Sequence, residues 1–515
     1  MPKVYSGWIA SFVYMEKWKR FRLVSTGKNR ITPNFSPIDT GEKVGIMGEN
    51  KEKRLILMHM QHKKSTARDM TQGSIIKQLV LFALPLMLGN VFQMLYNTVD
   101  SVVVGNFVGT QALAAVGSTT MIVNIMVFFF NGFSTGASVV IARRFGARDT
   151  ERLHTAIQTT MATTFILAVF FTVIGLIGVK PMLRFMVTPD DVFGEATIYL
   201  RIYIGGFSGL VIYNMCSGIL RAVGDTTRPL YFLILTSVLN IILDLFFVLK
   251  LRAGIAGVAY ATIISQFVSA GLTLLLLTRT KDIYRLDWKG LKVNGQVLRE
   301  IVSVGLPAAI QSVITSFSNV FVQSYINSFG SICMAGWSAY NKLDQFVLLP
   351  MQSLAMAATT FVSQNMGAGQ EKRAGKGTVA TVSLSVGVTG VIILLVCIFA
   401  APAMSLFTPD EAVIEFGVLF VRTNFVFLLF NCVNHVLAGA LRGRGDSTAP
   451  MAIMLLTFVG LRQTYLFIMT HFISNTPMAV GFGYPVGWMA CCVIEVTYYF
   501  ARWGRKKPEM LQDIQ

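Results

Sequence analysis

The sequence LRAVGDTTRP at positions 220–229 returns in altered form as LRGRGDSTAP at positions 441–450. Four residues of the first copy, Arg221, Gly224, Asp225 and Pro229, therefore recur 221 positions later. Nearly the same offset pairs Arg201 with Arg422, Gly146 with Gly367, and the Leu-Pro at 84–85 with the Leu-Pro at 306–307. Matches at so constant an offset indicate that a unit of about 220 residues has been duplicated.

The composition indicates a membrane protein. Hydrophobic residues make up 53% of the chain, charged residues only 14%, and the mean hydropathy is +0.59. About 20 apolar residues cross the core of a bilayer. Such windows lie near 76–100, 112–136, 155–179, 196–220, 229–249 and 254–278, and again near 298–322, 331–356, 376–400, 415–439, 450–474 and 478–501. We predict an all-α polytopic membrane protein with 12 transmembrane helices, six in each of two lobes.

The orientation follows from the distribution of Lys and Arg in the short loops, because cytoplasmic loops carry an excess of them. One side of the predicted helices holds most of these residues, including Arg143, Arg144, Arg148, Arg228, Lys372, Arg373 and Arg444, and the opposite side collects acids, including Asp190, Asp191, Asp410 and Glu411. We therefore expect both termini in the cytoplasm. An even number of helices per lobe gives both lobes the same polarity, related by a pseudo-twofold axis along the membrane normal.

Outside the repeat, residues 1–69 are polar and basic, which predicts a disordered cytoplasmic extension that is either dispensable or the product of an upstream start site. The predicted boundaries are 70–282 for the N-lobe with helices 1–6, 283–505 for the C-lobe with helices 7–12, and 506–515 for a cytoplasmic tail.

Several function classes are disfavoured. The net charge of +18 is assigned to loops and tails that face anionic lipid, and not to nucleic-acid binding. The six Cys lie in apolar segments without metal-ligand spacing, which predicts neither a disulfide framework nor a zinc site. No Gly-rich loop ends in Gly-Lys-Ser/Thr, so ATP is not expected to drive the protein directly. No nucleophile–base arrangement or His-Glu-x-x-His motif appears, so we do not expect an enzyme.

Two acids inside predicted helices are candidates for function, since a charge at the centre of a membrane helix costs about 2.5–3.5 kcal/mol. Asp100 shares a helix face with Gln93, and Asp244 shares one with Asn240. Carboxylate and amide oxygens suit a proton or an alkali cation. The corresponding positions of the second lobe hold Val322, Leu461 and Tyr465, so the site belongs to one lobe only.

Structural alternatives remain for these residues. Asp100 lies near a Gly-containing loop and could sit at the membrane interface, and Asp244 could pair with Lys250 or Arg252 at a helix end. In the second lobe we consider substrate contact or gating for Lys342 and Asp344, near the start of the eighth helix, and for Arg462 in the eleventh. Arg462 could equally be the buried partner of an ion pair.

These features together resemble the multidrug and toxic compound extrusion (MATE) family. The resemblance rests on the twofold six-helix repeat, the YNTVD sequence at 96–100, the paired LRAVGD and LRGRGD motifs, and FVSQNMGAG at 361–369, and it covers about residues 72–505. Within the family, the chain is similar to the prokaryotic branch whose cation site uses acidic residues of the N-lobe. The resemblance implies that Asp100 and Asp244 bind the coupling H⁺ or Na⁺, and that the surrounding polar network comprises Asn240, Asn214, Gln93, Tyr199 and Thr262. The seventh helix carries Gln311, Asn319 and Gln323 without a carboxylate, which argues against a coupling site in the C-lobe.

The expected function is that of a secondary active antiporter that exports lipophilic or cationic drugs and toxic compounds in exchange for H⁺ or Na⁺. The alternative within the same superfamily is a flippase for a lipid-linked oligosaccharide. We expect a monomer in the cell membrane, with small-molecule substrates and membrane lipids as its partners. We expect no cofactor and no tightly bound metal, and Na⁺ is one of the two coupling ions considered at Asp100 and Asp244.

Overall fold

The computed structural model describes residues 67–504 and is almost entirely helical over that range, without a strand. Eleven helices in the described residues are long and apolar enough to span a membrane, and a twelfth span is completed by one bent pair of helices. The predicted fold class, an all-α membrane protein of about twelve spans, is confirmed. Residues 1–66 and 505–515, which include most of the predicted extension and the tail, lie outside the described residues.

The first six spans are built from seven α-helices, two of which end in π-helical turns. Their bounds are α2 (Ile75–Val103) with η2 (Val104–Val108), α3 (Thr110–Gly146), α4 (Thr150–Phe185), α5 (Asp190–Gly205), α6 (Phe207–Ala222), α7 (Thr227–Leu245) with η3 (Phe246–Lys250), and α8 (Gly254–Arg279).

The last six spans repeat this order. They comprise α9 (Gly295–Asn327), α10 (Ser331–Gly367), α11 (Glu371–Ile398), α12 (Ala400–Ser405), α13 (Glu411–Asn424), α14 (Leu428–Gly443), α15 (Thr448–Met454), η6 (Leu455–Leu461), α16 (Arg462–Ile468), η7 (Met469–Ile473), α17 (Pro477–Gly481) and α18 (Gly483–Tyr499). Short 3₁₀ segments, η4 (Trp288–Gly290) and η5 (Phe425–Phe427), and the final π-helix η8 (Phe500–Gly504) complete the set.

The predicted span at 196–220 differs from the structure, which has two helices there. α5 and α6 meet at an angle of 45° around Gly206. A Cβ at Gly206 would clash with the side chain of Ile263 in α8, so only glycine allows this close approach. A hydropathy window records that a segment is apolar but not where close packing bends it.

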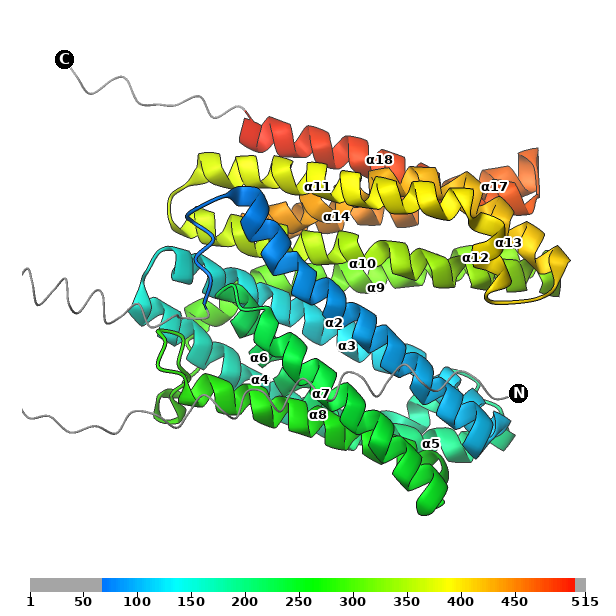
Figure 1. The fold of residues 1–515 in the computed structure, drawn as a ribbon, viewed down its shortest axis with the longest axis horizontal. Helices are drawn as coiled ribbons and strands as arrows, with labels where there is room; N and C mark the ends of the chain where they lie inside the picture. The colour runs from blue at the N-terminus through cyan, green and yellow to red at the C-terminus, as the bar shows by residue number, and fades with distance from the viewer. Residues whose placement is uncertain (1–66, 505–515) are drawn as a thin grey trace, which may run out of the picture. The chain divides into compact units, whose positions relative to one another are not determined.

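The two lobes meet through α3, which packs against both α9 and α10, and through α2, which packs against α10 (Figure 1). Small residues permit this contact. A Cβ at Gly132 would meet Ala309 of α9, and one at Gly136 would meet the backbone of Ile301 and Gly305. Membrane helices that pack this closely rely on such small residues.

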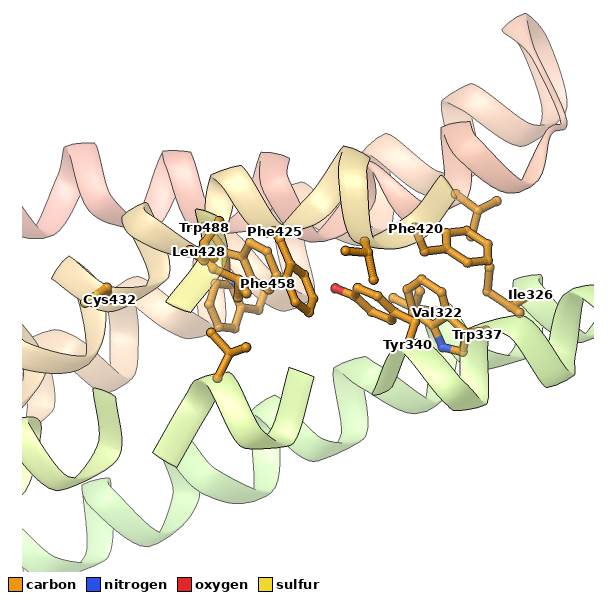
Figure 2. Close-up of a cluster of buried hydrophobic side chains, with 14 of the residues drawn as sticks. Val322, Ile326, Trp337, Tyr340, Phe420, Phe425, Leu428, Cys432, Phe458 and Trp488 are labelled. Carbon is orange, nitrogen blue, oxygen red and sulfur yellow. The ribbon is translucent and has the colours of Figure 1, made fainter. Parts of the chain in front are cut away.

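An aromatic cluster fills the core of the second lobe (Figure 2). The ring of Trp337 lies 4.8 Å from that of Phe420 and 4.8 Å from that of Tyr340, and Tyr340 lies 5.5 Å from Phe425. These side chains come from α10, α13 and η5, so the cluster joins the eighth helix to the tenth. Outward-facing Leu, Ile and Phe residues cover the spans, as a lipid-facing surface requires.

The described chain begins just before the first span. The amide of Arg68 donates a hydrogen bond to the Val223 carbonyl at 3.0 Å, and the amide of Thr71 donates to Asp69. Asp69 also forms an ion pair of 3.3 Å with Arg148. Residues 67–69 therefore contact the loops of the first lobe. The lobe boundaries proposed from the sequence remain predictions.

Candidate functional site

A cavity of about 650 Å³ lies between α2, α3, α5, α6 and α8 of the first lobe and α10 of the second. A smaller cavity of about 140 Å³ adjoins it, between α2, α6, α7 and α8. Polar side chains are numerous on both walls. Those shared by the two cavities are Asn90, Gln93, Tyr96, Asn214, Arg221, Thr262 and Gln266.

Asp100 lines the larger cavity, inside the first span rather than at its end. The span runs from Ile75 to Val108, so eight residues follow Asp100 before the helix stops. The atom Oδ1 of Asp100 is buried and has no hydrogen-bond partner in the described chain. Asp100 therefore belongs to the cavity wall, and the alternative that it lies at the membrane interface stays a prediction.

Asp244 is fully buried, and its carboxylate is the neighbouring group with which Asp100 interacts electrostatically. Apart from the contact between the two carboxyl groups, neither oxygen of Asp244 has a hydrogen-bond partner among the described residues, and both polar atoms of the Asn240 side chain are unpartnered as well. The alternative of an ion pair between Asp244 and Lys250 or Arg252 is not formed among the described residues, and Lys250 lies instead over the ring of Phe246 at 5.7 Å. Buried polar groups usually have partners, so this cluster is unusual.

The other residues predicted for the cation site gather around these acids. Gln93, Asn214, Tyr199 and Thr262 all line the larger cavity, and Asn240 lines the smaller one. Tyr199 interacts electrostatically with both carboxylates. The structure thus brings together the seven residues singled out from the sequence, although Asp244 itself lines neither cavity.

Sequence reasoning missed several polar residues of the same wall. Tyr96 and Tyr203 interact with Asp100, and Asn124, Asn131 and Gln266 also line the larger cavity. A partial signal existed for Gln266, which lies four residues after Thr262 and so shares its helix face. No signal of spacing linked Asn124 and Asn131 to the site, because they lie on a separate helix.

The duplicated Gly-Asp motif forms a helix-capping corner in each lobe. Asp225 Oδ1 accepts a hydrogen bond from the Arg228 amide at 3.2 Å, and Asp446 Oδ1 accepts one from the Ala449 amide at 3.2 Å. Asp225 also pairs with the Arg228 side chain at 3.1 Å. Burial raises the pKa of the Asp225 carboxyl, and the contacts with Arg228 oppose that rise.

The charged candidates of the second lobe lie away from both cavities. Lys342 and Asp344 sit about three turns inside α10 rather than at its start. Lys342 is exposed with its Nζ 5.7 Å from the Phe407 ring, and Asp344 Oδ1 is buried without a hydrogen-bond partner in the described chain.

Arg462 is buried, with 1% of its surface exposed, but it pairs with no carboxylate among the described residues. It donates hydrogen bonds to Ser318 Oγ and to Asn319 Oδ1, the latter at 3.1 Å. Its guanidinium also lies 4.8 Å from the ring of Tyr484. Arg462 therefore joins the eleventh, seventh and twelfth helices through neutral partners.

The sequence reasoning also overlooked Glu495, a fully buried acid of α18. Both of its carboxylate oxygens lack hydrogen-bond partners in the described chain, and the charge with which it interacts is that of Arg442. Arg442 in turn donates a hydrogen bond of 2.9 Å to Gln311 Oε1. The sequence did contain a signal for Glu495, because a charged residue within an apolar window is also the feature that identified Asp100.

Hydrogen bonds close one end of the lobe interface. Gln364 of α10 accepts from the Met70 amide and donates to the Ala222 carbonyl, each at 2.9 Å. Asn365 donates to the Met70 carbonyl at 3.3 Å. We call this the Met70 end. It joins the start of the first span, the end of α6 and the second lobe.

Comparison with known proteins identifies the family. The sequence model of the MatE family matches the chain twice, at residues 85–246 and 307–467, which is more than half of its length. The chain therefore belongs to the MatE family, and the two matches follow the duplication seen in the sequence.

Individual relatives extend over most of the chain. It is 29% identical over 445 residues to "Probable multidrug resistance protein YoeA" of Bacillus subtilis, covering 85% of this chain and 96% of that protein. It is 29% identical over 410 residues to "Probable multidrug resistance protein NorM" of Thermotoga maritima, covering 77% and 86%. The fold matches a solved MOP superfamily transporter from Pyrococcus furiosus with a TM-score of 0.81, at 24% identity, over 86% of this chain and 99% of that one.

Proposed function

We propose that this chain is a secondary active antiporter that exports lipophilic or cationic compounds in exchange for H⁺ or Na⁺. The observation that supports this most is the contact between two acids, half-buried Asp100 and fully buried Asp244, beside a polar cavity of about 650 Å³. Membership of the MatE family and the multidrug-resistance names of its relatives support export of small molecules.

The acids supply the proposed coupling chemistry. Two adjacent buried carboxylates repel one another, so a proton or a sodium ion shared between them removes charge that is costly inside a membrane. Asn240 adds an amide oxygen next to Asp244. Because Asp100 and Pro85 lie on the same helix, neutralising the acids can change how α2 packs and release the exported compound from the cavity.

We assign the Met70 end to the cytoplasm of the cell, with both termini on that side of the plasma membrane, because the Arg-rich loops lie there. The hydrogen bonds of Gln364 to Met70 and Ala222 would then hold the inner side closed. In this assignment the cavity serves an outward-facing state, and transport requires that these bonds break and re-form. We propose that a single chain carries out this cycle as a monomer.

The rival function, movement of a lipid-linked oligosaccharide, is less well supported. A pyrophosphate group calls for several cationic side chains. Arg221 is the single Lys or Arg among the residues that line the two cavities. An enzymatic function has no support from the arrangement of the described side chains, which we interpret as those of a transporter.

Dye extrusion from a drug-sensitive bacterial host tests the proposal. Cells that express the chain should lose a lipophilic cationic dye faster than cells with an empty vector, and the difference should disappear when a proton ionophore or a sodium ionophore collapses the gradient that drives it. Extrusion that persists without either gradient, or no extrusion at all, would count against antiport.

A further inference from the structure

Arg221 is a cation in the wall of both cavities. Among the described residues its side chain forms no hydrogen bond, ion pair or ring contact, and the ionisable group with which it interacts is the phenol of Tyr213. Asp225, which lies four residues further along the chain, forms an ion pair of 3.1 Å with Arg228 instead. The positive charge of Arg221 therefore faces the cavity without an acidic partner.

The second lobe shows how the duplicated arginine is otherwise accommodated. Arg442 lies 221 positions after Arg221 in the matching motif. It donates a hydrogen bond of 2.9 Å to Gln311 and interacts with the buried carboxylate of Glu495. The side chain of Arg442 therefore has a hydrogen-bond partner and an acidic neighbour inside the protein.

The first lobe lacks both compensating groups. The position that corresponds to Gln311 at the offset of 222 is Gly89, which has no side chain. Glu495 corresponds, at offsets of 221–224, to residues 271–274, which are Gly, Leu, Thr and Leu. Arg221 is half-buried, and none of its side-chain nitrogen atoms is among the buried atoms that lack a partner, so its guanidinium is open to the cavity and can contact a molecule there.

The two cavity charges lie far apart along the helices. Asp100 and Leu86 both line the larger cavity and are separated by 14 residues of α2, a rise of about 21 Å. Arg221 is the second-last residue of α6, whose last carbonyl, that of Ala222, is tied to Gln364 at the Met70 end. The cavity thus has an acidic side toward Asp100 and a basic side toward the Met70 end.

We propose that Arg221 binds an anionic group, a carboxylate or a phosphate, on the exported compound, so that among lipophilic compounds the cavity gives zwitterionic and anionic amphiphiles a contact that plain cations do not use. A guanidinium presents paired N–H donors that match carboxylate and phosphate oxygens. Asn90 and Asn214 on the same wall add neutral polar groups. This inference rests on the proposed export function and specifies its substrate class.

Two rhodamine probes with one ring system provide the test. The ethyl ester is a cation, whereas the free acid is a zwitterion at neutral pH. Binding to the purified full chain is measured by fluorescence anisotropy, and export by uptake into inside-out proteoliposomes. In Arg221→Gln, affinity for the free acid should fall at least tenfold and affinity for the ester by less than twofold. Arg221→Lys, which keeps the charge, should retain most binding of the acid.

Arg442→Gln is the matched control, because it removes the same side chain at a compensated position. It should lower abundance without changing the ratio of the two affinities. The anionic group could belong to a lipid or to a free compound. Translocation of a fluorescent phosphatidylglycerol, measured in the same vesicles, distinguishes the two sources. Transport of either the lipid or the free acid that depends on Arg221 supports the anion site.

The outcomes separate the two proposals. If the parent chain exports the ester but Arg221→Gln weakens both probes equally, or leaves both unchanged, the anion site is wrong while the export function stands. If the parent chain exports neither probe, the export function fails together with the inference.

Discussion

Gly146 and Gly367, which are equivalent residues of the two repeats, lie at a reciprocal contact between the lobes. A Cβ on Gly146 would clash with the Gln364 carbonyl of α10, and a Cβ on Gly367 would clash with the Arg143 carbonyl of α3. Each glycine therefore lets its helix approach the backbone of the other lobe. The contact lies beside the hydrogen bonds of Gln364 at the Met70 end.

Gly146→Val should keep the Met70 end from closing, because the added side chain forces α3 and α10 apart. We expect dye export, normalised to protein abundance, to fall at least tenfold. Gly117→Val on the same helix is the control, since nothing lies within 4 Å of a Cβ at Gly117. Equal export by the two variants would show that the close approach is not needed.

The corner aspartates should contribute to stability more than to substrate range. Asp225→Ala and Asp446→Ala each remove a capping hydrogen bond to a backbone amide, a loss of about 1 kcal/mol. Membrane abundance should drop in both variants, while relative resistance to a panel of drugs stays as in the parent. Asp190→Ala, at an exposed site, should change neither quantity. A normal abundance with a selectively altered drug profile would refute the structural role.

Glu495 is expected to stabilise the second lobe by compensating Arg442. Glu495→Gln removes the acid that interacts with half-buried Arg442 and should lower the free energy of unfolding by about 1 kcal/mol, because the two side chains interact without forming an ion pair. Thermal unfolding in detergent measures the loss. The double variant Glu495→Gln with Arg442→Gln should unfold at a higher temperature than Glu495→Gln alone. A single variant that is as stable as the parent would exclude this role.

Hydropathy and repeat spacing were sufficient to predict the helices and the duplication, because a membrane span needs a long apolar segment whatever it packs against. They could not predict the bend at Gly206, which depends on contact with Ile263 in a helix distant in sequence. The sequence shows that Gly146 and Gly367 are equivalent residues of the two repeats. It does not show that α3 and α10 approach each other closely at these glycines.

The candidate site was predicted where a charge interrupts an apolar helix, as at Asp100 and Asp244. Uncharged residues of the cavity wall, such as Asn124 and Asn131, were not predicted, because they lie on another helix and no spacing links them to the two acids. Arg221 escaped as well, because a basic residue at the cytoplasmic end of a span is expected and gives no sign of a position in the cavity wall. Which side of a helix faces a cavity depends on the packing of the other helices.

The central claim is that Asp100 and Asp244 couple cation movement to export. Asn substitution keeps the size and hydrogen-bonding capacity of each side chain and removes its charge. Asp100→Asn and Asp244→Asn should therefore insert normally and still bind a probe dye, but fail to concentrate it against a gradient. Asn240→Ala should weaken the same step less, because it leaves both charges in place.

The most direct measurement imposes a pH jump, and separately a sodium jump, on proteoliposomes that contain the parent chain or Asp100→Asn, and follows uphill dye transport. We expect the parent to accumulate dye under one of the two gradients, and Asp100→Asn to bring the dye no further than equilibrium. If Asp100→Asn drives cation-dependent uphill transport at close to the parent rate, the coupling site proposed here is contradicted.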